Sequence, residues 1–292
     1  MWQDIQIFGF RALWSPYYMI FILCLGLAYY FLFVHRTDNK KASSQQILYL
    51  YGGLLLLYII KGSPIDLMSH IMFTAHMIQM AIYYLIFPIL IIKGIPSWAW
   101  EKVFQLSLLR LLTKPLIALI LFNGLFSFYH IPLIFDFAKA NEYAHAVITS
   151  TILIAAFFMW WPIFTPIKKL ETLTPLLKIG YIIANGILIT PACALIIFSL
   201  DSLYQTYTAN GGWIQALALC VPSDVLSGLA LSGPEMFSPL GLTEDQQLGG
   251  IVMKITQEII YGCLLARIFF PWFRSGADKV DPLPSATYQQ SE

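Results

Sequence analysis

The chain has 292 residues, of which 58% are hydrophobic and only 11% are charged, and its net charge is +1. Soluble domains carry about one quarter charged residues, so this composition indicates that lipid surrounds most of the chain. The near-zero net charge argues against a nucleic-acid partner. Four scattered cysteines form no CxxC pair and predict neither a disulfide framework nor a thiolate metal site.

Seven apolar segments are long enough to be membrane spans, since a helix needs about 20 apolar residues to cross the hydrocarbon core. They predict an all-α, polytopic helical bundle in the plasma membrane. The N-terminus lacks the basic stretch and cleavage site of a signal peptide, so the first span is expected to remain as an anchor. The predicted spans are 15–34, 46–60, 68–92, 115–135, 145–164, 178–200 and 248–272. Prolines inside them predict kinks at Pro88, Pro132, Pro162 and Pro191.

The orientation follows from the basic residues in alternate connections. Most basic residues fall in the connections on one side of the membrane, and the connections on the opposite side carry only Arg11, Lys61 and Lys139. This asymmetry predicts that the N-terminus lies outside the cytoplasm and the C-terminus inside. The basic residues on the side predicted to be cytoplasmic are Arg36, Lys40, Lys41, Lys93, Lys102, Arg110, Lys114, Lys168, Lys169, Lys178, Arg274 and Lys279.

One long connection and the C-terminal tail complete the predicted organisation. Connection 201–247 has no Lys or Arg, and its apolar middle, 213–231, is interrupted by Pro222, Ser223 and Asp224. We interpret 213–231 as an interfacial or re-entrant segment instead of an eighth span. Residues 1–274 are predicted to form one transmembrane domain, and the polar segment 275–292 is predicted to be a disordered cytoplasmic tail.

Histidines and methionines gather in the predicted outer half of the membrane. On a continuous helix over 66–80, His70, His76 and Met80 would share an arc of about 120° with Asp66 and Met77. A single intramembrane histidine is commonly a hydrogen-bonded packing residue, and Met commonly fills helix interfaces. Here four histidines are predicted on the outer side of the membrane, and two of them, His70 and His76, share one helical arc with Met77 and Met80. This combination favours a metal-binding site. The candidate ligands are His70, His76, Met77, Met80, His130, His145 and Met253.

The start of the last span carries residues that could support such a site. Asp245 and Gln247 crowd its outer end, where a carboxylate also complements the helix dipole, and Asp66 is a third candidate supporting residue. Gly249 and Gly250 would let another helix approach closely. Further along, Lys254 and Glu258 form an i,i+4 pair that can neutralise itself.

The chemistry of the candidate ligands points to copper. Thioethers are soft ligands that favour Cu(I), whereas zinc would recruit Cys and calcium or magnesium would require more carboxylates. Haem remains a rival, because imidazoles or a thioether on different helices can be axial ligands. No phosphate loop, nucleophile elbow, HExxH or paired-carboxylate arrangement is found, so we do not expect an enzyme.

Three segments give the chain a family resemblance. KGSPIDLMSHIMFTAHMIQM, YHIPLIFDFAKANEYAHA with the later MWWP, and EDQQLGGIVMKI are similar to the Gram-positive CtaG family, over nearly the whole chain. These polytopic factors assemble caa-type haem-copper cytochrome c oxidases. The resemblance implies a role in oxidase assembly and copper supply, with the four histidines above and the DQQ…GG…M pattern matching the family. Many relatives have a further His near Gln79 or Met80; its absence here favours Met participation.

These observations together predict a membrane assembly factor that binds copper, as transient Cu(I), near its extracytoplasmic face and delivers it to the oxidase. Its expected partners are oxidase subunits, other copper chaperones and the lipid bilayer. Two alternatives stay open. One is a transporter of copper or another small solute, and the other is a haem-binding membrane redox protein.

Overall fold

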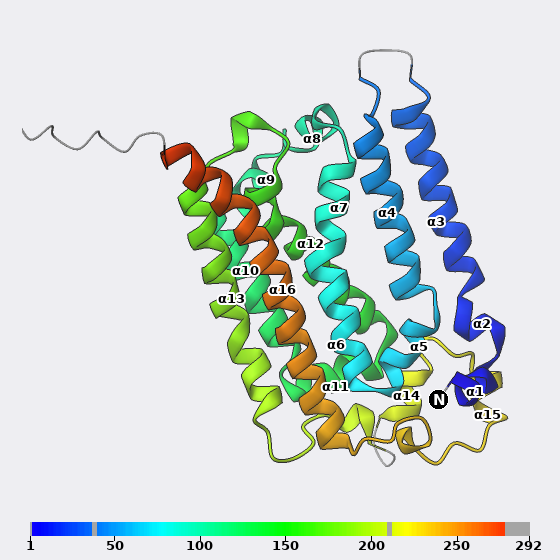
Figure 1. Cartoon of the computed structure of the whole chain (residues 1–292). Helices are drawn as coiled ribbons and strands as arrows, with labels where there is room; N and C mark the ends of the chain where they lie inside the picture. Colours follow the sequence, from blue (N-terminus) through cyan, green and yellow to red (C-terminus); the bar gives the residue numbers. More distant parts are fainter. Residues whose placement is uncertain (1, 37–39, 209–211, 278–292) are drawn as a thin grey trace, which may run out of the picture.

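The computed structural model describes residues 2–36, 40–208 and 212–277, and every regular element in these ranges is helical (Figure 1). Five helices are long and apolar enough to cross a membrane, and counting two bent helix pairs as one span each brings the number to seven. This confirms the predicted all-α, polytopic bundle of about seven spans. The chain is a multi-pass membrane protein.

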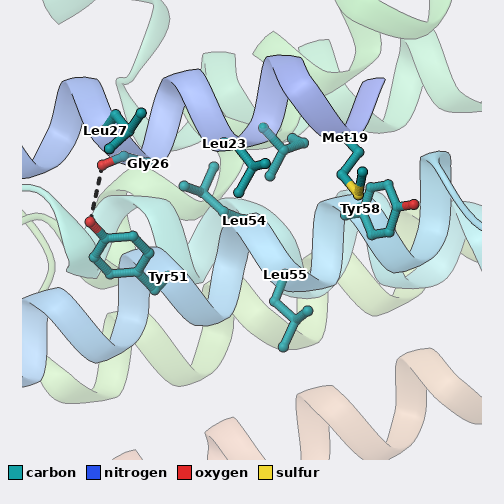
Figure 2. A pocket seen from close by; sticks show the side chains of 9 residues that line it. Met19, Leu23, Gly26, Leu27, Tyr51, Leu54, Leu55 and Tyr58 are labelled. Atoms are coloured by element: carbon teal, nitrogen blue, oxygen red, sulfur yellow. Dashed lines mark hydrogen bonds between the residues drawn. The ribbon is translucent and has the colours of Figure 1, made fainter. Parts of the chain in front are cut away.

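The first two spans form a hairpin at one edge of the bundle (Figure 1). α1 (Trp2–Ile5) and α2 (Gly9–Trp14) precede α3 (Pro16–Tyr29), which ends in a π-helical turn. α4 (Ser44–Lys61) begins with a capping box between Ser43 and Gln46. An apolar groove of about 360 Å³ lies between α3 and α4, beside the hydrogen bond from Tyr51 to the Gly26 carbonyl (Figure 2).

Short helices follow α4 where a single long span was predicted. α5 (Pro64–Ile71) is bent by 43° from α4, and Pro64 is its first residue. Met72 is extended (φ −125°, ψ 136°), so α6 (Phe73–Ala81) is a separate helix. A π-helical turn then leads into α7 (Phe87–Gly94). The predicted spans 46–60 and 68–92 are therefore wrong at their shared boundary.

The fourth span is also broken. α10 (Pro115–Tyr129) and α11 (Pro132–Ala140) meet at 76°, because Pro132 can start a helix but cannot continue one. The predicted continuous span 115–135 is thus wrong at its outer end. Of the other predicted kinks, Pro88 follows the π-helical turn directly, whereas Pro162 and Pro191 lie inside uninterrupted helices, α12 (Glu142–Phe164) and α13 (Pro175–Ile197).

The last span, α16 (Leu242–Ala277), packs against α13 on one side and α6 on the other. A Cβ at Gly249 would lie 2.7 Å from the Phe73 ring, and one at Gly250 would lie 2.8 Å from Ile197. This confirms that the two glycines permit close helix approach. The α6–α7 span also packs against α4 and α12, which places it centrally in the bundle.

Short elements gather at the two ends of the bundle (Figure 1). α8 (Ser97–Val103) and α9 (Ser107–Leu112) lie at the end where α16 finishes. At the other end, α1, α5 and α11 lie with α14 (Trp213–Leu217) and α15 (Ser223–Ser227). Both helices of segment 213–231 are too short to cross a membrane. Residues 278–292, most of the tail predicted to be disordered, lie outside the described residues.

Candidate metal centre

The four histidines predicted to share one side of the membrane do lie at one end of the bundle, on α5, α6, α12 and the turn between α10 and α11 (Figure 1). They form two pairs. The ring centroids of His70 and His145 are 5.8 Å apart, and those of His76 and His130 are 6.3 Å apart. Breaks at Met72 and before Pro132 bring these residues together, since each break turns a short helix across the end of the bundle.

His76 occupies a fully buried aromatic box. Its ring lies 5.9 Å from Phe73, 6.0 Å from Tyr129 and 5.1 Å from Phe135, between centroids. Neither ring nitrogen has a hydrogen-bond partner in the described part of the chain. A buried polar atom without a partner costs about 1–3 kcal/mol, so His76 holds two such atoms where a packing residue would hold none.

His130 presents a free lone pair beside His76. Its Nδ1 lies 2.7 Å from the Phe126 carbonyl oxygen, which can only accept, so Nδ1 donates and carries the proton. Nε2 then has the lone pair, and this atom is buried without a partner among the described residues. A hydrogen bond that fixes one ring nitrogen and leaves the other unprotonated is the usual arrangement of a metal-binding imidazole.

The three candidate methionines are buried in the same apolar cluster as the aromatic box. Met80 lies one helical turn from His76 on α6, so the two side chains are neighbours on one face. Met77 lies against α16, where a Cβ at Gly249 would come 3.2 Å from its Cγ. Met253 is one turn beyond Gly249 on α16. These thioethers are therefore the soft side chains that share a core with His76 and His130.

A buried lysine separates the second histidine pair from this arrangement. Lys139 on α11 is 1% exposed, and its Nζ lies 3.4 Å from His70 Nδ1 and 3.5 Å from the Ser69 carbonyl oxygen. His70 Nδ1 thus already has a partner, whereas both His76 nitrogens and His130 Nε2 have none in the described part of the chain, so the His76–His130 pair is the better candidate.

The sequence indicated Lys139 only as a basic residue of an outer connection. The one local signal was its i,i+4 spacing from Phe135, over whose ring its Nζ lies at 5.9 Å. Burial of a lysine depends on what α14 and the 205–207 turn place over α11, and local sequence does not contain that information.

The candidate supporting residues hold the frame of the site. Asp66 pairs with Lys61 at 3.2 Å and accepts a hydrogen bond from Gln79 at 2.7 Å. Asp245 accepts from the backbone N–H groups of Phe73 (2.6 Å) and Thr74 (3.2 Å), and so caps α6.

Gln247, the remaining supporting candidate, donates to the Ser199 carbonyl oxygen at 2.9 Å. That contact ties the first turns of α16 to the connection that follows α13. Together with the Asp245 cap, it fixes where α16 starts relative to α6 and the histidines.

One expectation about the site was wrong. Asp66 and His70 lie on α5, whereas His76, Met77 and Met80 lie on α6, so the five do not share an arc of one helix. Moreover, among the described residues no three His, Cys, Asp or Glu side chains come together as a metal-binding group. A metal ion at His76 would therefore have to take further ligands of another kind, and the buried thioethers are the candidates that share its core.

A polar cavity of about 640 Å³ reaches Asp66 and Glu142, which lie about one helical turn before His70 and His145. Lys61, Asp66 and Glu142 line it together with Arg11 and Cys220. Burial, reinforced by the nearby Asp66 carboxylate, raises the pKa of the Cys220 thiol, so this sulfur stays protonated and is a weak ligand. The cavity places water-accessible polar side chains next to the α5 helix that carries His70.

The fold and the site define a multi-pass helical membrane protein with a buried group of imidazoles and thioethers at one end. The family model of the cytochrome c oxidase caa3 assembly factor (Caa3_CtaG) matches residues 28–275. The chain belongs to this family, whose role implies interaction with cytochrome c oxidase. Neither a comparison with curated proteins nor one with solved structures finds a match.

Proposed function

We propose that this assembly factor holds Cu(I) transiently between His76 and His130, with thioethers from Met77, Met80 or Met253, and delivers it to the oxidase. The observation that carries the proposal is the fully buried His76 imidazole, both of whose nitrogens lack partners in the described part of the chain. A bound metal ion would satisfy one of them and the His130 Nε2 at the same time.

The surroundings of His76 match the chemistry of Cu(I). This ion is soft and accepts imidazole and thioether ligands, and it carries a single charge. Aromatic rings surround His76, and neither of its nitrogens bonds a carboxylate among the described residues, so a divalent ion would be left with uncompensated charge in a low-dielectric site. Aromatic faces can stabilise a single positive charge by cation–π attraction.

Transient binding fits the absence of stronger ligands. Within the described residues the site offers no thiolate and only two facing imidazoles, so copper can leave for a partner with more ligands. The predicted orientation places this end of the bundle outside the cytoplasm. Delivery would then occur on the side from which the polar cavity of Lys61, Asp66 and Cys220 opens.

A transporter is supported less well, because it needs ligands that continue across the membrane. The soft side chains available deeper in the bundle do not form a path: Cys24 and Cys263 are exposed on the outer surface, whereas Cys193 and Met159 are buried. Haem binding is also supported less well. Three aromatic rings and a second imidazole pack within 6.3 Å of the His76 ring, in the space that a macrocycle would require.

The test replaces the chromosomal gene with one that encodes His76→Leu. Leucine fills the aromatic box but has no atom that can bind a metal. His35→Leu is the matched control, because His35 is an exposed histidine at the opposite end of the bundle. We expect His76→Leu to leave oxidase polypeptides present but to lower the copper content and activity of the purified oxidase. Total cellular copper should stay level. A change in total copper would favour transport, and full oxidase copper in the His76→Leu strain would refute the proposal.

A further inference from the structure

An ion pair stands midway along two neighbouring spans, on the surface of the bundle. Glu258 is the midpoint of the last span, Leu242–Arg274, and Gly186 is the midpoint of the neighbouring span, Pro175–Ile197. Lys254 Nζ and Glu258 Oε1 are 2.7 Å apart, which confirms the pairing expected from their spacing. Charged side chains at this depth are rare, and they nearly always face the bundle interior.

The two partners are placed differently. Lys254 turns inward and donates to Gln257 Oε1 (2.9 Å), Thr190 Oγ1 (3.0 Å) and the Gly186 carbonyl oxygen (3.4 Å). Glu258 turns outward, with 60% of its side chain exposed. Within the described residues, Glu258 contacts Lys254 Nζ and Gln257 Nε2, and both contacts are made by its Oε1 atom. The other carboxylate oxygen, Oε2, faces the lipid.

A shallow groove accompanies this carboxylate. It has a volume of about 220 Å³ and runs between α13 and α16. Ile183 and Ile187 form its lipid-facing rim, and Gly186 lies in its lining, where a Cβ would come 3.3 Å from Gln257 Nε2 of α16. Small residues of this kind let neighbouring helices approach closely in a membrane, here α13 and α16. The groove thus combines room for a side chain of a docked helix with a carboxylate oxygen whose hydrogen-bonding capacity lipid chains cannot satisfy.

We propose that this groove docks a transmembrane helix of the oxidase under assembly, which presents a neutral hydrogen-bond donor, an amide or a hydroxyl, to Glu258 Oε2. The identity of the partner rests on the proposed function in oxidase assembly. The donor is neutral because Lys254 already balances the charge of Glu258, and a further cation would be uncompensated in hydrocarbon.

Other occupants fit less well. A second copy of this chain, related by a two-fold axis along the membrane normal, would place Glu258 against its own equivalent and bring like charges together. A lipid headgroup cannot reach the centre of the hydrocarbon core. A transmembrane helix with a neutral polar side chain reaches this depth and brings no like charge to Glu258.

The experiment places a photo-crosslinking amino acid at Ile183, on the rim of the groove, in membranes that contain the oxidase. The matched control carries it at Ile120, a lipid-facing residue of α10 with similar exposure (57% against 49%). We expect an adduct with an oxidase subunit from Ile183 and not from Ile120. Glu258→Leu should reduce this adduct about fivefold, the effect of one interhelical hydrogen bond in a membrane, and Glu258→Gln should retain it.

A second variant guards against misfolding, since Glu258→Leu leaves Lys254 without its carboxylate. Lys254→Leu/Glu258→Leu removes both members of the ion pair and leaves no unpaired charge, so it should insert normally and also lose the adduct. An adduct with a second copy of this chain, an equal adduct from Ile120, or an adduct unchanged in both Leu variants would overturn the docking proposal. Copper analysis of the oxidase in the His76→Leu strain tests the proposed function separately, because that residue is far from the groove in sequence and lies on a different helix.

Discussion

The Asp245 carboxylate is the residue whose removal should reveal most about how the histidines are positioned. It is 6% exposed, and its two oxygens accept the backbone N–H groups of Phe73 and Thr74 at the break between α5 and α6. Asp245→Ala leaves both donors at the first turn of α6 without a partner. The break at Met72 should then relax, and the position of His70 relative to His76 should change.

The magnitude follows from the two bonds. Hydrogen bonds to a charged group contribute about 1.5–3 kcal/mol each, so their sum sets an upper bound of about 3–6 kcal/mol. Water at this end of the bundle will replace part of the loss, so we expect Asp245→Ala to lower the free energy of unfolding by about 2–4 kcal/mol. Asp245→Asn keeps one acceptor and should lose about half as much.

Reversible unfolding in mixed micelles, followed by circular dichroism, measures this difference. Asp201→Ala is the control, because Asp201 is exposed and contributes only its main-chain oxygen to the hydrogen bond with Ser199. Cu(I) titration of the same variants should show weaker binding for Asp245→Ala alone. Equal unfolding free energies for Asp245→Ala and Asp201→Ala would refute the reasoning that this carboxylate maintains the break.

Three further predictions follow from the packing, the buried lysine and the charge distribution. Gly249→Ala should destabilise the fold by about 1–3 kcal/mol, because its Cβ would meet the Phe73 ring at 2.7 Å. Gly262→Ala, with open space around it, should stabilise the fold by about 0.5–1 kcal/mol. Thermal denaturation of both variants in detergent measures the two effects. Lys139→Leu should raise Cu(I) affinity by about tenfold in a competitive titration, because it removes a basic amino group, 3.4 Å from His70 Nδ1, whose protonated form a bound cation would repel; unchanged affinity would place the metal elsewhere. Reporter fusions after Thr113, Pro166 and Ser275 should be cytoplasmic and those after Asn141 and Asp201 external; a cytoplasmic signal at Asp201 would contradict the predicted orientation.

The spans could be located from sequence because hydrocarbon imposes a length on every apolar helix. The close approach at Gly249 and Gly250 was also visible, since adjacent glycines in a span have few other uses. Pro132 was recognised as a kink, but the 76° turn that places α11 across the bundle end depends on packing against α12 and α14. Local sequence therefore indicated where the chain could bend and not how far.

The break at Met72 could not be predicted, for a specific reason. Residues 66–80 contain no Gly or Pro, and their pattern predicts one continuous helix. The carboxylate that caps the start of α6 after the break belongs to Asp245 on the last span. The histidines were correctly assigned to one end of the bundle by topology alone. Their division into two pairs, and the burial of Lys139 between them, depend on contacts among segments distant in sequence.

The most direct test of the proposed site is X-ray absorption spectroscopy of the purified protein loaded with Cu(I), in the wild type and in His76→Leu, His130→Leu and His35→Leu. This spectroscopy counts the nitrogen and sulfur ligands of the metal directly. We expect mixed nitrogen and sulfur ligands in the wild type and His35→Leu, and the loss of a nitrogen ligand in each of the other two variants. A nitrogen-only shell, or identical spectra in all four proteins, would contradict the proposed site.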